Sequence, residues 1–237
     1  MIIAITRIAE KSSDDIDLLQ RYGHECRIVS PIQAKLFTNV VQQFVIAAND
    51  NEFDAIFFTS AYPAKIIGPQ LSDSVIDNTR IIAIGPQTAK ILKKTGINTV
   101  EMLNSFYSKD FVPYLGEWIR DKSIGIPRAT NPNPELIESI ESSGGLVFEY
   151  KCYSLDPTHN PIDLTDVDAI IFTSSSSYRF SEFSSGLGST IPIAIGTVTA
   201  NTMRENGVNP VIVGDGSLEG TLNRLNTFIN NNGPGGI

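Results

Sequence analysis

The sequence predicts an α/β fold with two similar domains, each a doubly wound parallel sheet. Three observations support this. Short apolar runs rich in Ile, Val and Phe alternate with stretches of helical spacing. These runs are continuously apolar, which is typical of parallel strands covered on both faces. Long segments of the first half recur in the second, and 237 residues leave room for two domains of about 100–120 residues.

The predicted strands are the short apolar runs. They are residues 2–5, 28–29, 55–58, 81–84, 124–126, 147–150, 169–172, 193–195 and 211–213. Helices are predicted between them. The clearest covers residues 88–94, where two lysines precede Gly96, as at a helix C-terminus. Pro134 and Glu135 suit the first turn of another helix.

The internal repeat decides how many domains to expect. Residues 54–60 recur as 168–174, residues 82–89 recur as 193–200, and a weaker pair precedes each. Such long repeated segments indicate a duplicated structural unit. The repeat allows a tandem arrangement or a nested one, with the middle of the chain inserted into the first domain. Connector-like segments bracket that middle part, which favours nesting.

Composition excludes several classes of protein. Acidic residues (26) outnumber basic ones (18), and the net charge of −8 argues against a general nucleic-acid binder, although a local basic cleft stays possible. Cys26 and Cys152 read as buried free thiols of a reducing compartment. His24 and His159 lack the spacing of metal ligands. With no leader-like N-terminus and no membrane-length apolar run, we expect a soluble cytoplasmic protein.

The candidate binding residues follow the predicted strands, because ligands of parallel α/β sheets bind beyond the carboxyl ends of the strands. Hydroxyls and glycines dominate there, and several of these residues open helices. Such loops suit carboxylates or phosphates, although Ser and Thr can also simply cap helices. The candidates are Thr6, Arg7, Thr59, Ser60, Gly85, Thr88, Arg128, Thr173, Ser174, Ser175, Ser176, Gly196, Thr197 and Thr199.

Common cofactor motifs are missing from the sequence. It lacks G-x-x-x-x-G-K followed by Ser or Thr, and it lacks G-x-G-x-x-G after the first strand. The serine run 174–177 is not a nucleophile elbow, which requires G-x-S-x-G and a histidine base. We therefore expect a cofactor-free and metal-free cleft between two domains, lined by hydroxyls, backbone donors and a few arginines.

Taken together and in order, these motifs resemble the uroporphyrinogen-III synthase family. The resemblance extends from Ile3 to about Leu222. It rests on residues 5–7, 58–60, 83–89, 126–128, 144–145, 149–153, 171–174 and 194–200. The resemblance implies a lyase that closes hydroxymethylbilane into uroporphyrinogen III, inverts the last pyrrole ring, loses water and uses no cofactor.

The family fold implies the nested arrangement. Two flavodoxin-like α/β domains would be joined by a two-stranded connector, and the first domain would be discontinuous. Residues 1–33 plus 159–237 would form the first domain, residues 37–153 the second, and residues 34–36 and 154–158 the connector.

The resemblance also assigns roles to residues. Tyr153 matches a family tyrosine proposed as the acid for departure of the hydroxyl, although a packed aromatic at a strand end is the plainer interpretation. The substrate's acetate and propionate groups would meet the hydroxyl loops, the helix ends and Arg7 or Arg128. The expected partner is this linear polycarboxylate, with no nucleic acid or membrane, and we expect a monomer.

Two other functions remain open at this point. A two-domain small-molecule binding protein without catalysis would share the duplication, and it would retain a ligand without turning it over. An enzyme dependent on a nucleotide or sugar phosphate would share the doubly wound fold. The missing glycine fingerprints count against the second alternative, and fold likeness alone would not separate these functions.

Overall fold

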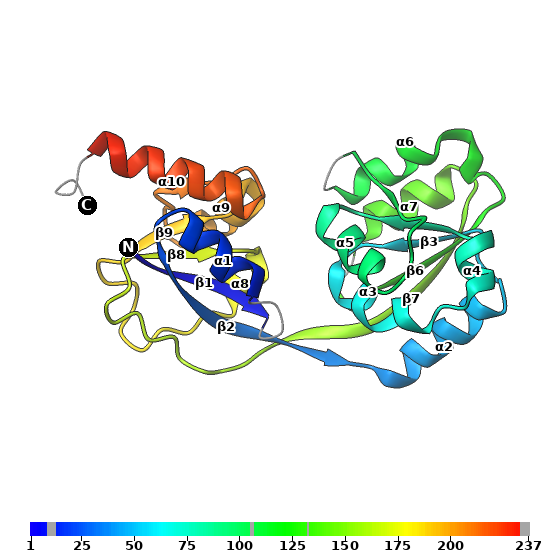
Figure 1. The fold of residues 1–237 in the computed structure, drawn as a ribbon, viewed down its shortest axis with the longest axis horizontal. Helices are drawn as coiled ribbons and strands as arrows, with labels where there is room; N and C mark the ends of the chain where they lie inside the picture. The colour runs from blue at the N-terminus through cyan, green and yellow to red at the C-terminus, as the bar shows by residue number, and fades with distance from the viewer. Residues whose placement is uncertain (9–12, 105–106, 132, 233–237) are drawn as a thin grey trace. The chain divides into compact units, whose positions relative to one another are not determined.

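A computed structural model describes residues 1–8, 13–104, 107–131 and 133–232. The fold is mixed α/β with a mostly parallel arrangement of strands, as predicted (Figure 1). Contacts divide the chain into two compact units. We call Met1–Ala34 with Leu155–Ile237 unit 1, and Lys35–Ser154 unit 2. In the part of the chain that the structure describes, no helix has the length and apolarity to span a membrane.

Unit 1 contains the strand order β10-β9-β8-β1-β2, and every pairing in it is parallel. The strands are β1 (Ile2–Ile8), β2 (Glu25–Leu36), β8 (Ala169–Phe172), β9 (Ile191–Ala194) and β10 (Ile212–Val213). The helices are α1 (Ser13–Arg21), α8 (Ser175–Arg179), α9 (Thr197–Glu205) and α10 (Leu218–Asn232). Alternate residues of one strand enter different cores: Ile3 and Ile5 join one cluster and Ala4 another.

Unit 2 repeats this plan with the order β7-β6-β3-β4-β5, also parallel throughout. The strands are β3 (Ala55–Phe58), β4 (Arg80–Ala83), β5 (Glu101–Met102), β6 (Ser123–Ala129) and β7 (Leu146–Pro157). The helices are α2 (Thr38–Asn49), α3 (Ala61–Ile67), α4 (Asp73–Asn78), α5 (Pro86–Lys94), α6 (Phe111–Leu115) and α7 (Pro134–Ser142). Short 3-10 turns are η1 (Gly68–Gln70), η2 (Ser108–Asp110) and η3 (Gly116–Ile119).

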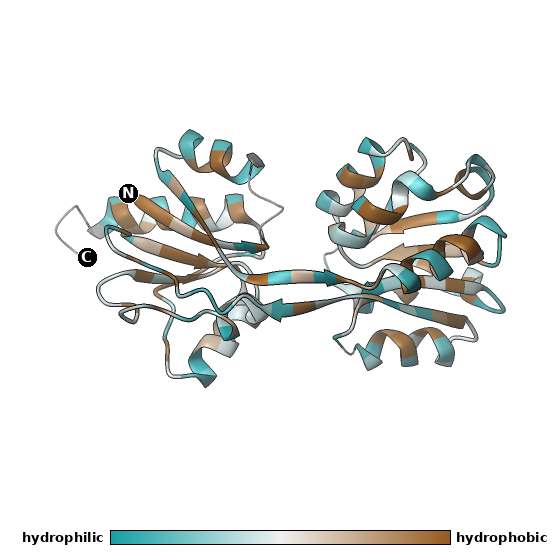
Figure 2. Cartoon of the chain, turned by 90° about the horizontal axis from the view of Figure 1, so that it is seen from below, coloured by the Kyte–Doolittle hydropathy of each residue, from teal (hydrophilic) through white to brown (hydrophobic). Residues whose placement is uncertain are grey.

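Burial explains why the strands read as continuous apolar runs. All four residues of β3 and all four of β8 are buried, because helices cover both faces of each sheet. Figure 2 shows the strands as largely hydrophobic ribbons and the helices as hydrophobic on one side. Each predicted strand coincides with or overlaps an observed one. The sequence did not indicate β5, which has only two residues.

The segments that bracket the middle of the chain are largely extended strand. Residues expected to be connectors continue β2 to Leu36 and β7 to Pro157. Within unit 1, the amide of Thr158 donates to the carbonyl of Pro31 at 3.0 Å. Within unit 2, the amide of Phe37 donates to the carbonyl of Cys152 at 2.8 Å.

The two units share an irregularity in strand pairing. The β1–β2 register shifts between Thr6 and Ile8, so that Ile8 is opposite Ile32. The β6–β7 register shifts after Arg128, so that Ala129 is opposite Tyr153. Ile32 and Tyr153 therefore occupy corresponding places in the duplicated units.

Candidate functional site

The predicted site residues form two groups, one at the carboxyl edge of the strands in each unit. In unit 1, Thr6 and Arg7 lie within β1, which extends beyond the predicted strand, and the others follow β8 and β9. In unit 2, Arg128 and Tyr153 lie within β6 and β7, and the others follow β3 and β4. Because the strands of each unit are parallel, these ends meet at one edge of its sheet. The unit 1 group is Thr6, Arg7, Thr173, Ser174, Ser175, Ser176, Gly196, Thr197 and Thr199, and the unit 2 group is Thr59, Ser60, Gly85, Thr88, Arg128 and Tyr153.

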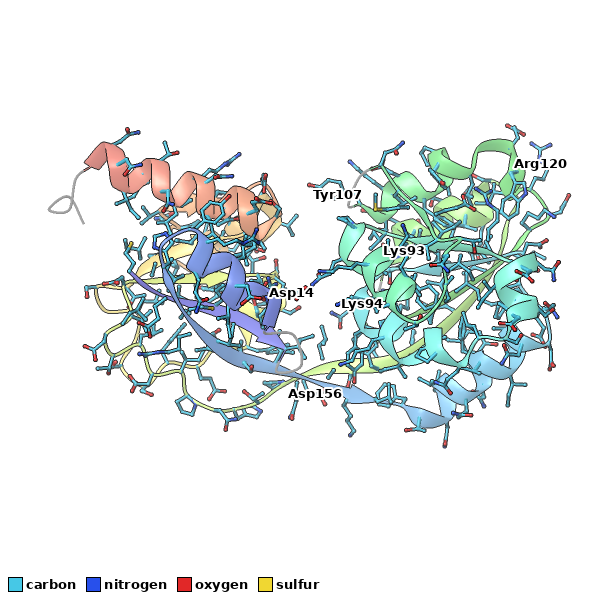
Figure 3. All side chains as sticks on the ribbon, in the orientation of Figure 1. Asp14, Lys93, Lys94, Tyr107, Arg120 and Asp156 are labelled. Atoms are coloured by element: carbon cyan, nitrogen blue, oxygen red, sulfur yellow. The ribbon has the colours of Figure 1, made fainter. Side chains whose placement is uncertain are left out.

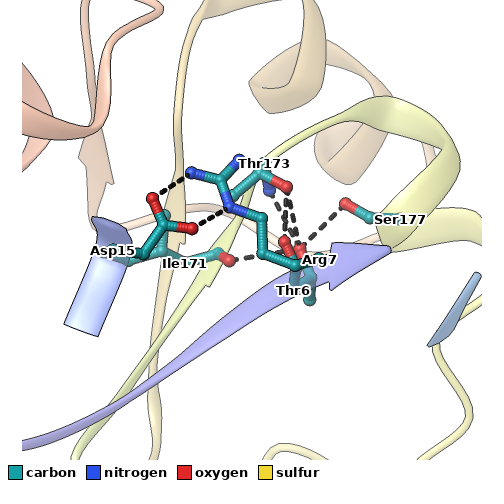
Figure 4. A network of polar contacts seen from close by, with 6 residues as sticks. All are labelled: Thr6, Arg7, Asp15, Ile171, Thr173 and Ser177. Atoms are coloured by element: carbon teal, nitrogen blue, oxygen red, sulfur yellow. Dashed lines mark hydrogen bonds and ion pairs between the residues drawn. The ribbon is translucent and has the colours of Figure 1, made fainter. Parts of the chain in front are cut away.

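Thr6 is the centre of a buried hydroxyl network in unit 1 (Figure 4). Its side chain is fully buried. Its Oγ1 lies 2.9 Å from Ser177 Oγ and accepts a hydrogen bond from the Thr173 amide at 3.0 Å. Thr173 Oγ1 in turn donates to the Thr6 carbonyl. The network joins β1 to the start of α8, so Thr6 helps to hold the loop between β8 and α8 in place.

Both predicted arginines are paired with acids of their own unit. Arg7 binds Asp15 with two hydrogen bonds, from Nε at 2.6 Å and from Nη2 at 3.0 Å. Arg128 donates from Nη1 to Glu149 Oε1 at 2.9 Å and from Nη2 to the Asn131 carbonyl. The Arg128 side chain is only 8% exposed. Each positive charge is therefore locally balanced.

The helices at this edge begin in two ways. Ser174 caps α8 in a capping box with Ser177, which is the plain N-cap role considered for these serines. Gly85 and Gly196 begin α5 and α9 with nearly identical extended backbones and no side-chain cap. The first turns of α5 and α9 therefore keep amide groups that no side-chain cap satisfies.

The hydroxyls along these helices differ in exposure. Thr88 and Thr199 are buried within the first turns of α5 and α9. Thr197 is exposed, while Thr59, Thr173 and Ser176 are half-buried. Ser175 accepts a hydrogen bond from Thr202 at 2.9 Å. The more accessible hydroxyls thus lie in the loops after β3 and β8 and in the first turns of α8 and α9, while Thr88 and Thr199 are buried in helix packing.

Tyr153 lies at the carboxyl edge of unit 2 with its side chain almost enclosed. It is 5% exposed, and its hydroxyl lies 2.9 Å from Ser60 Oγ. The ring of Tyr62 packs beside it, with centroids 4.8 Å apart. Burial raises the pKa of the Tyr153 phenol, and the hydrogen bond with Ser60 opposes that rise. The hydroxyl therefore stays protonated at neutral pH and can donate.

Three contributors to these groups were missed by sequence reasoning. Asp15 pairs with Arg7, Tyr62 packs on Tyr153, and Ser177 completes the box with Ser174. Ser177 had a readable signal, because it stands three residues after an N-cap serine. Asp15 and Tyr62 had none, since their contacts arise from packing.

A basic hollow lies beside α5 in unit 2. It is lined by Pro86, Ala89 and Met102 together with Lys90, Lys93 and Lys94. Lys93 and Lys94 extend from the last turn of the helix (Figure 3). Among the described residues, no group of three or more His, Cys, Asp or Glu could hold a metal ion. The chemistry on offer is hydrogen bonding, local positive charge and a protonated phenol.

A family comparison bears on this arrangement directly. The model of the family described as "Uroporphyrinogen-III synthase HemD" matches residues 14–218. The chain belongs to the uroporphyrinogen-III synthase family. Members of this family are cyclising lyases of haem biosynthesis. The family, enzyme class and α/β fold predicted from the sequence are thereby confirmed.

Individual relatives agree with the family assignment. A putative uroporphyrinogen-III synthase of Methanocaldococcus jannaschii is 25% identical over 249 residues, covering 96% of this chain and 99% of that protein. A mutant uroporphyrinogen III synthase of Thermus thermophilus has a similar fold, with a TM-score of 0.61, 18% identity and coverage of 97% and 98%. The uroporphyrinogen-III synthetase of Helicobacter pylori matches with a TM-score of 0.61, 18% identity and coverage of 96% and 100%.

Proposed function

We propose that this member of the family converts hydroxymethylbilane to uroporphyrinogen III, with Tyr153 as the acid. The observation that carries the proposal is the Tyr153 hydroxyl, enclosed, protonated and hydrogen-bonded to Ser60 at the carboxyl edge of unit 2. General acids of this kind lower the barrier for a poor leaving group.

The proposed reaction balances with this single acid. Tyr153 donates its proton to the terminal hydroxyl of the substrate, the C–O bond breaks, and water leaves. The resulting azafulvene is attacked by the substituted carbon of the last pyrrole, forming a spiro intermediate. That intermediate breaks and recloses with the ring inverted, and the proton released when the last ring regains aromaticity returns to the phenolate. Besides donating this proton, the protein holds the substrate in the inverting conformation.

The substrate is a polycarboxylate, and we propose that neutral donors bind it. The uncapped first turns at Gly85 and Gly196 offer amides. Further donors are the hydroxyls of the loops and first helical turns, namely Thr59, Thr173, Ser175, Ser176 and Thr197. The remaining predicted residues (Thr6, Arg7, Thr88, Arg128, Ser174 and Thr199) are buried or internally bonded, which supports a role in holding these loops in place.

The finer organisation belongs to the same proposal. Units 1 and 2 would be separate domains, the first of them discontinuous, joined by β2 and β7. The domain limits expected from the sequence lie within five residues of the unit boundaries. We further propose that the enzyme works as a cytoplasmic monomer without nucleic-acid partners.

Replacement of Tyr153 by phenylalanine tests the acid. We expect Tyr153→Phe to form uroporphyrinogen III at least several-fold more slowly, because the proton donor is lost while the ring stays packed on Tyr62. The assay supplies freshly made hydroxymethylbilane and separates the type I and type III isomers. Unchanged turnover would remove Tyr153 from the role of acid. Only type I product from the wild-type protein, as in a control without protein, would refute the proposed reaction and favour a binding protein.

A further inference from the structure

Ser60 and Ser174 are the corresponding residues of the duplicated units. Each follows the central strand of its unit, in the repeated segments 54–60 and 168–174. Each is the N-cap of the next helix, with φ and ψ of −161° and 161° at Ser60 and −165° and 161° at Ser174. Because the two backbone conformations are nearly the same, each hydroxyl is placed to accept a hydrogen bond from an amide in the first turn of its helix.

The two serines differ in their hydrogen bonds. Ser174 accepts a hydrogen bond from the Ser177 amide at 3.0 Å, and the Ser177 hydroxyl completes the box. Ser60 makes no capping hydrogen bond. The sequence explains this, because the third helical residue after Ser60 is Pro63, which has no N–H to donate. The hydroxyl of Ser60 is thereby released from the usual N-cap role.

Tyr153 supplies the alternative partner, and only in unit 2. The place that Tyr153 occupies after the register shift of β6–β7 is occupied in unit 1 by Ile32, which is buried and has no hydroxyl. Unit 1 thus combines a capping serine with an isoleucine, and unit 2 combines a non-capping serine with a tyrosine. Two independent positions differ between the repeats in a way that creates one hydrogen bond.

We infer that Ser60 is a positioning residue that donates its hydroxyl proton to Tyr153 Oη and so directs the phenol proton of Tyr153 toward the substrate. The inference rests on the proposed role of Tyr153 as acid. The 2.9 Å contact between the two oxygens allows either to donate. Only donation by Ser60 leaves the phenol proton available, and it also supports the phenolate after the transfer.

The surroundings support this direction. Burial alone would make the enclosed phenol a poorer acid, whereas the hydrogen bond with Ser60 lowers its pKa and so favours proton release. Tyr62 packs against the ring of Tyr153 and limits its movement. The hydrogen bond with Ser60 then restricts rotation of the Tyr153 hydroxyl about its C–O bond.

A double-mutant cycle on the full-length chain tests the inference. Loss of one hydrogen bond predicts that Ser60→Ala lowers kcat about two- to tenfold with KM nearly unchanged. Ser60→Thr, which keeps a hydroxyl, restores most of the rate. In a Tyr153→Phe background, Ser60→Ala has no further effect, because the group it positions is gone. An equal loss in both backgrounds, or no rescue by threonine, would overturn the inference.

A spectroscopic readout separates this inference from the acid role itself. With ring-labelled tyrosine and the Tyr153→Phe protein to assign the signal, the NMR titration of Tyr153 shifts to higher pH in Ser60→Ala. A titration unchanged by Ser60→Ala overturns the inference, whatever the rates. If Tyr153→Phe is fully active, the acid role fails, and a shifted titration still shows that Ser60 holds the hydroxyl.

Ser174→Ala is the matched control for folding. It removes a true cap, so the midpoint of thermal unfolding falls by about 2–4 °C. Ser60→Ala removes no cap but takes a hydrogen bond from the buried Tyr153 hydroxyl, so a fall of similar size is expected. The Tyr153 titration is the same in Ser174→Ala as in the wild type. A shift of the Tyr153 titration in Ser174→Ala as large as that in Ser60→Ala would identify Ser60 as an ordinary structural residue, because loss of stability alone would then move the titration.

Discussion

Arginines at corresponding places in the two units are each paired with an acid, from α1 in unit 1 and from β7 in unit 2, and this pairing changes what those arginines can do. Arg7 is balanced by Asp15 and Arg128 by Glu149. The free-energy cost of desolvating a buried ion pair is roughly offset by the attraction between its charges. The main effect of such a pair is therefore to fix the positions of its side chains. On the proposed function, neutral donors would meet the substrate carboxylates, and the paired arginines would hold the strand ends in place.

His24 gives a residue-scale prediction about pH. Its Nε2 lies 2.7 Å from Asn226 Oδ1, and its buried Nδ1 has no hydrogen-bond partner. Burial lowers the pKa of His24. Below about pH 6.5 the unfolded chain therefore binds more protons than the folded one, and the free energy of unfolding decreases as the pH is lowered. Urea unfolding at pH 7.5 and 5.5 should show this loss, at most about 1.4 kcal/mol per pH unit.

Two substitutions identify the source of that pH dependence. His24→Gln should reduce the difference in stability between the two pH values. His159→Gln, at an exposed site that pairs with Glu182, should keep it. An equal pH dependence in the wild type and His24→Gln would contradict the assignment.

At the scale of elements, β6 of unit 2 closely approaches Phe53, which lies between α2 and β3. A Cβ built on Gly125 of β6 would lie 2.7 Å from the Phe53 ring, which itself stacks on Phe44 of α2 at 5.5 Å. Gly125→Ala should therefore reduce the free energy of unfolding by about 1–3 kcal/mol, measured by denaturant titration. In a Phe53→Leu background the cost of Gly125→Ala should shrink. The same cost in both backgrounds would rule out the ring as the obstacle.

The elements also show what could be predicted from the sequence. Buried parallel strands such as β3 and β8 were evident, because burial on both faces demands unbroken apolar runs. Strand β5 was missed, since two residues carry no pattern. The hydroxyl loops and Tyr153 are predicted site residues, but the pairing of Arg7 with Asp15 could not be predicted, because it depends on how α1 packs. Pro63 already implies that Ser60 lacks the amide partner of an N-cap, but the significance of this becomes clear only from the comparison with Ser174 in the structure.

At the scale of the whole molecule, the net charge of −8 has the same sign as a polycarboxylate substrate and would repel it. The positive charge is unevenly placed, however, because residues 35–154 hold 11 of the 18 basic residues, among them every lysine except Lys11. Three of these lysines line the hollow beside α5. Local fields of this kind attract anions despite the overall charge.

The contiguous unit gives a whole-molecule prediction. Residues 35–154 expressed alone should fold, because their core is complete: Phe57, Phe111 and Ile124 belong to one buried cluster within the segment. A cooperative thermal transition by circular dichroism is the expected result. Phe57→Ala, which removes a ring stacked on Phe111 at 4.1 Å, should destabilise the segment by about 3–5 kcal/mol. A non-cooperative, featureless segment would show that unit 2 depends on unit 1.

The hydrogen bonds between Thr6 and Thr173 have a consequence for the order in which the molecule assembles during translation. Strand β1 pairs with β8, so the whole of unit 2 leaves the ribosome before that partner exists. At about 5–20 residues per second, this edge of β1 waits roughly 10–30 s for β8. The insert can fold first and the split unit closes last. Until then, a buried-type strand has an open edge that is available to chaperones and to wrong partners.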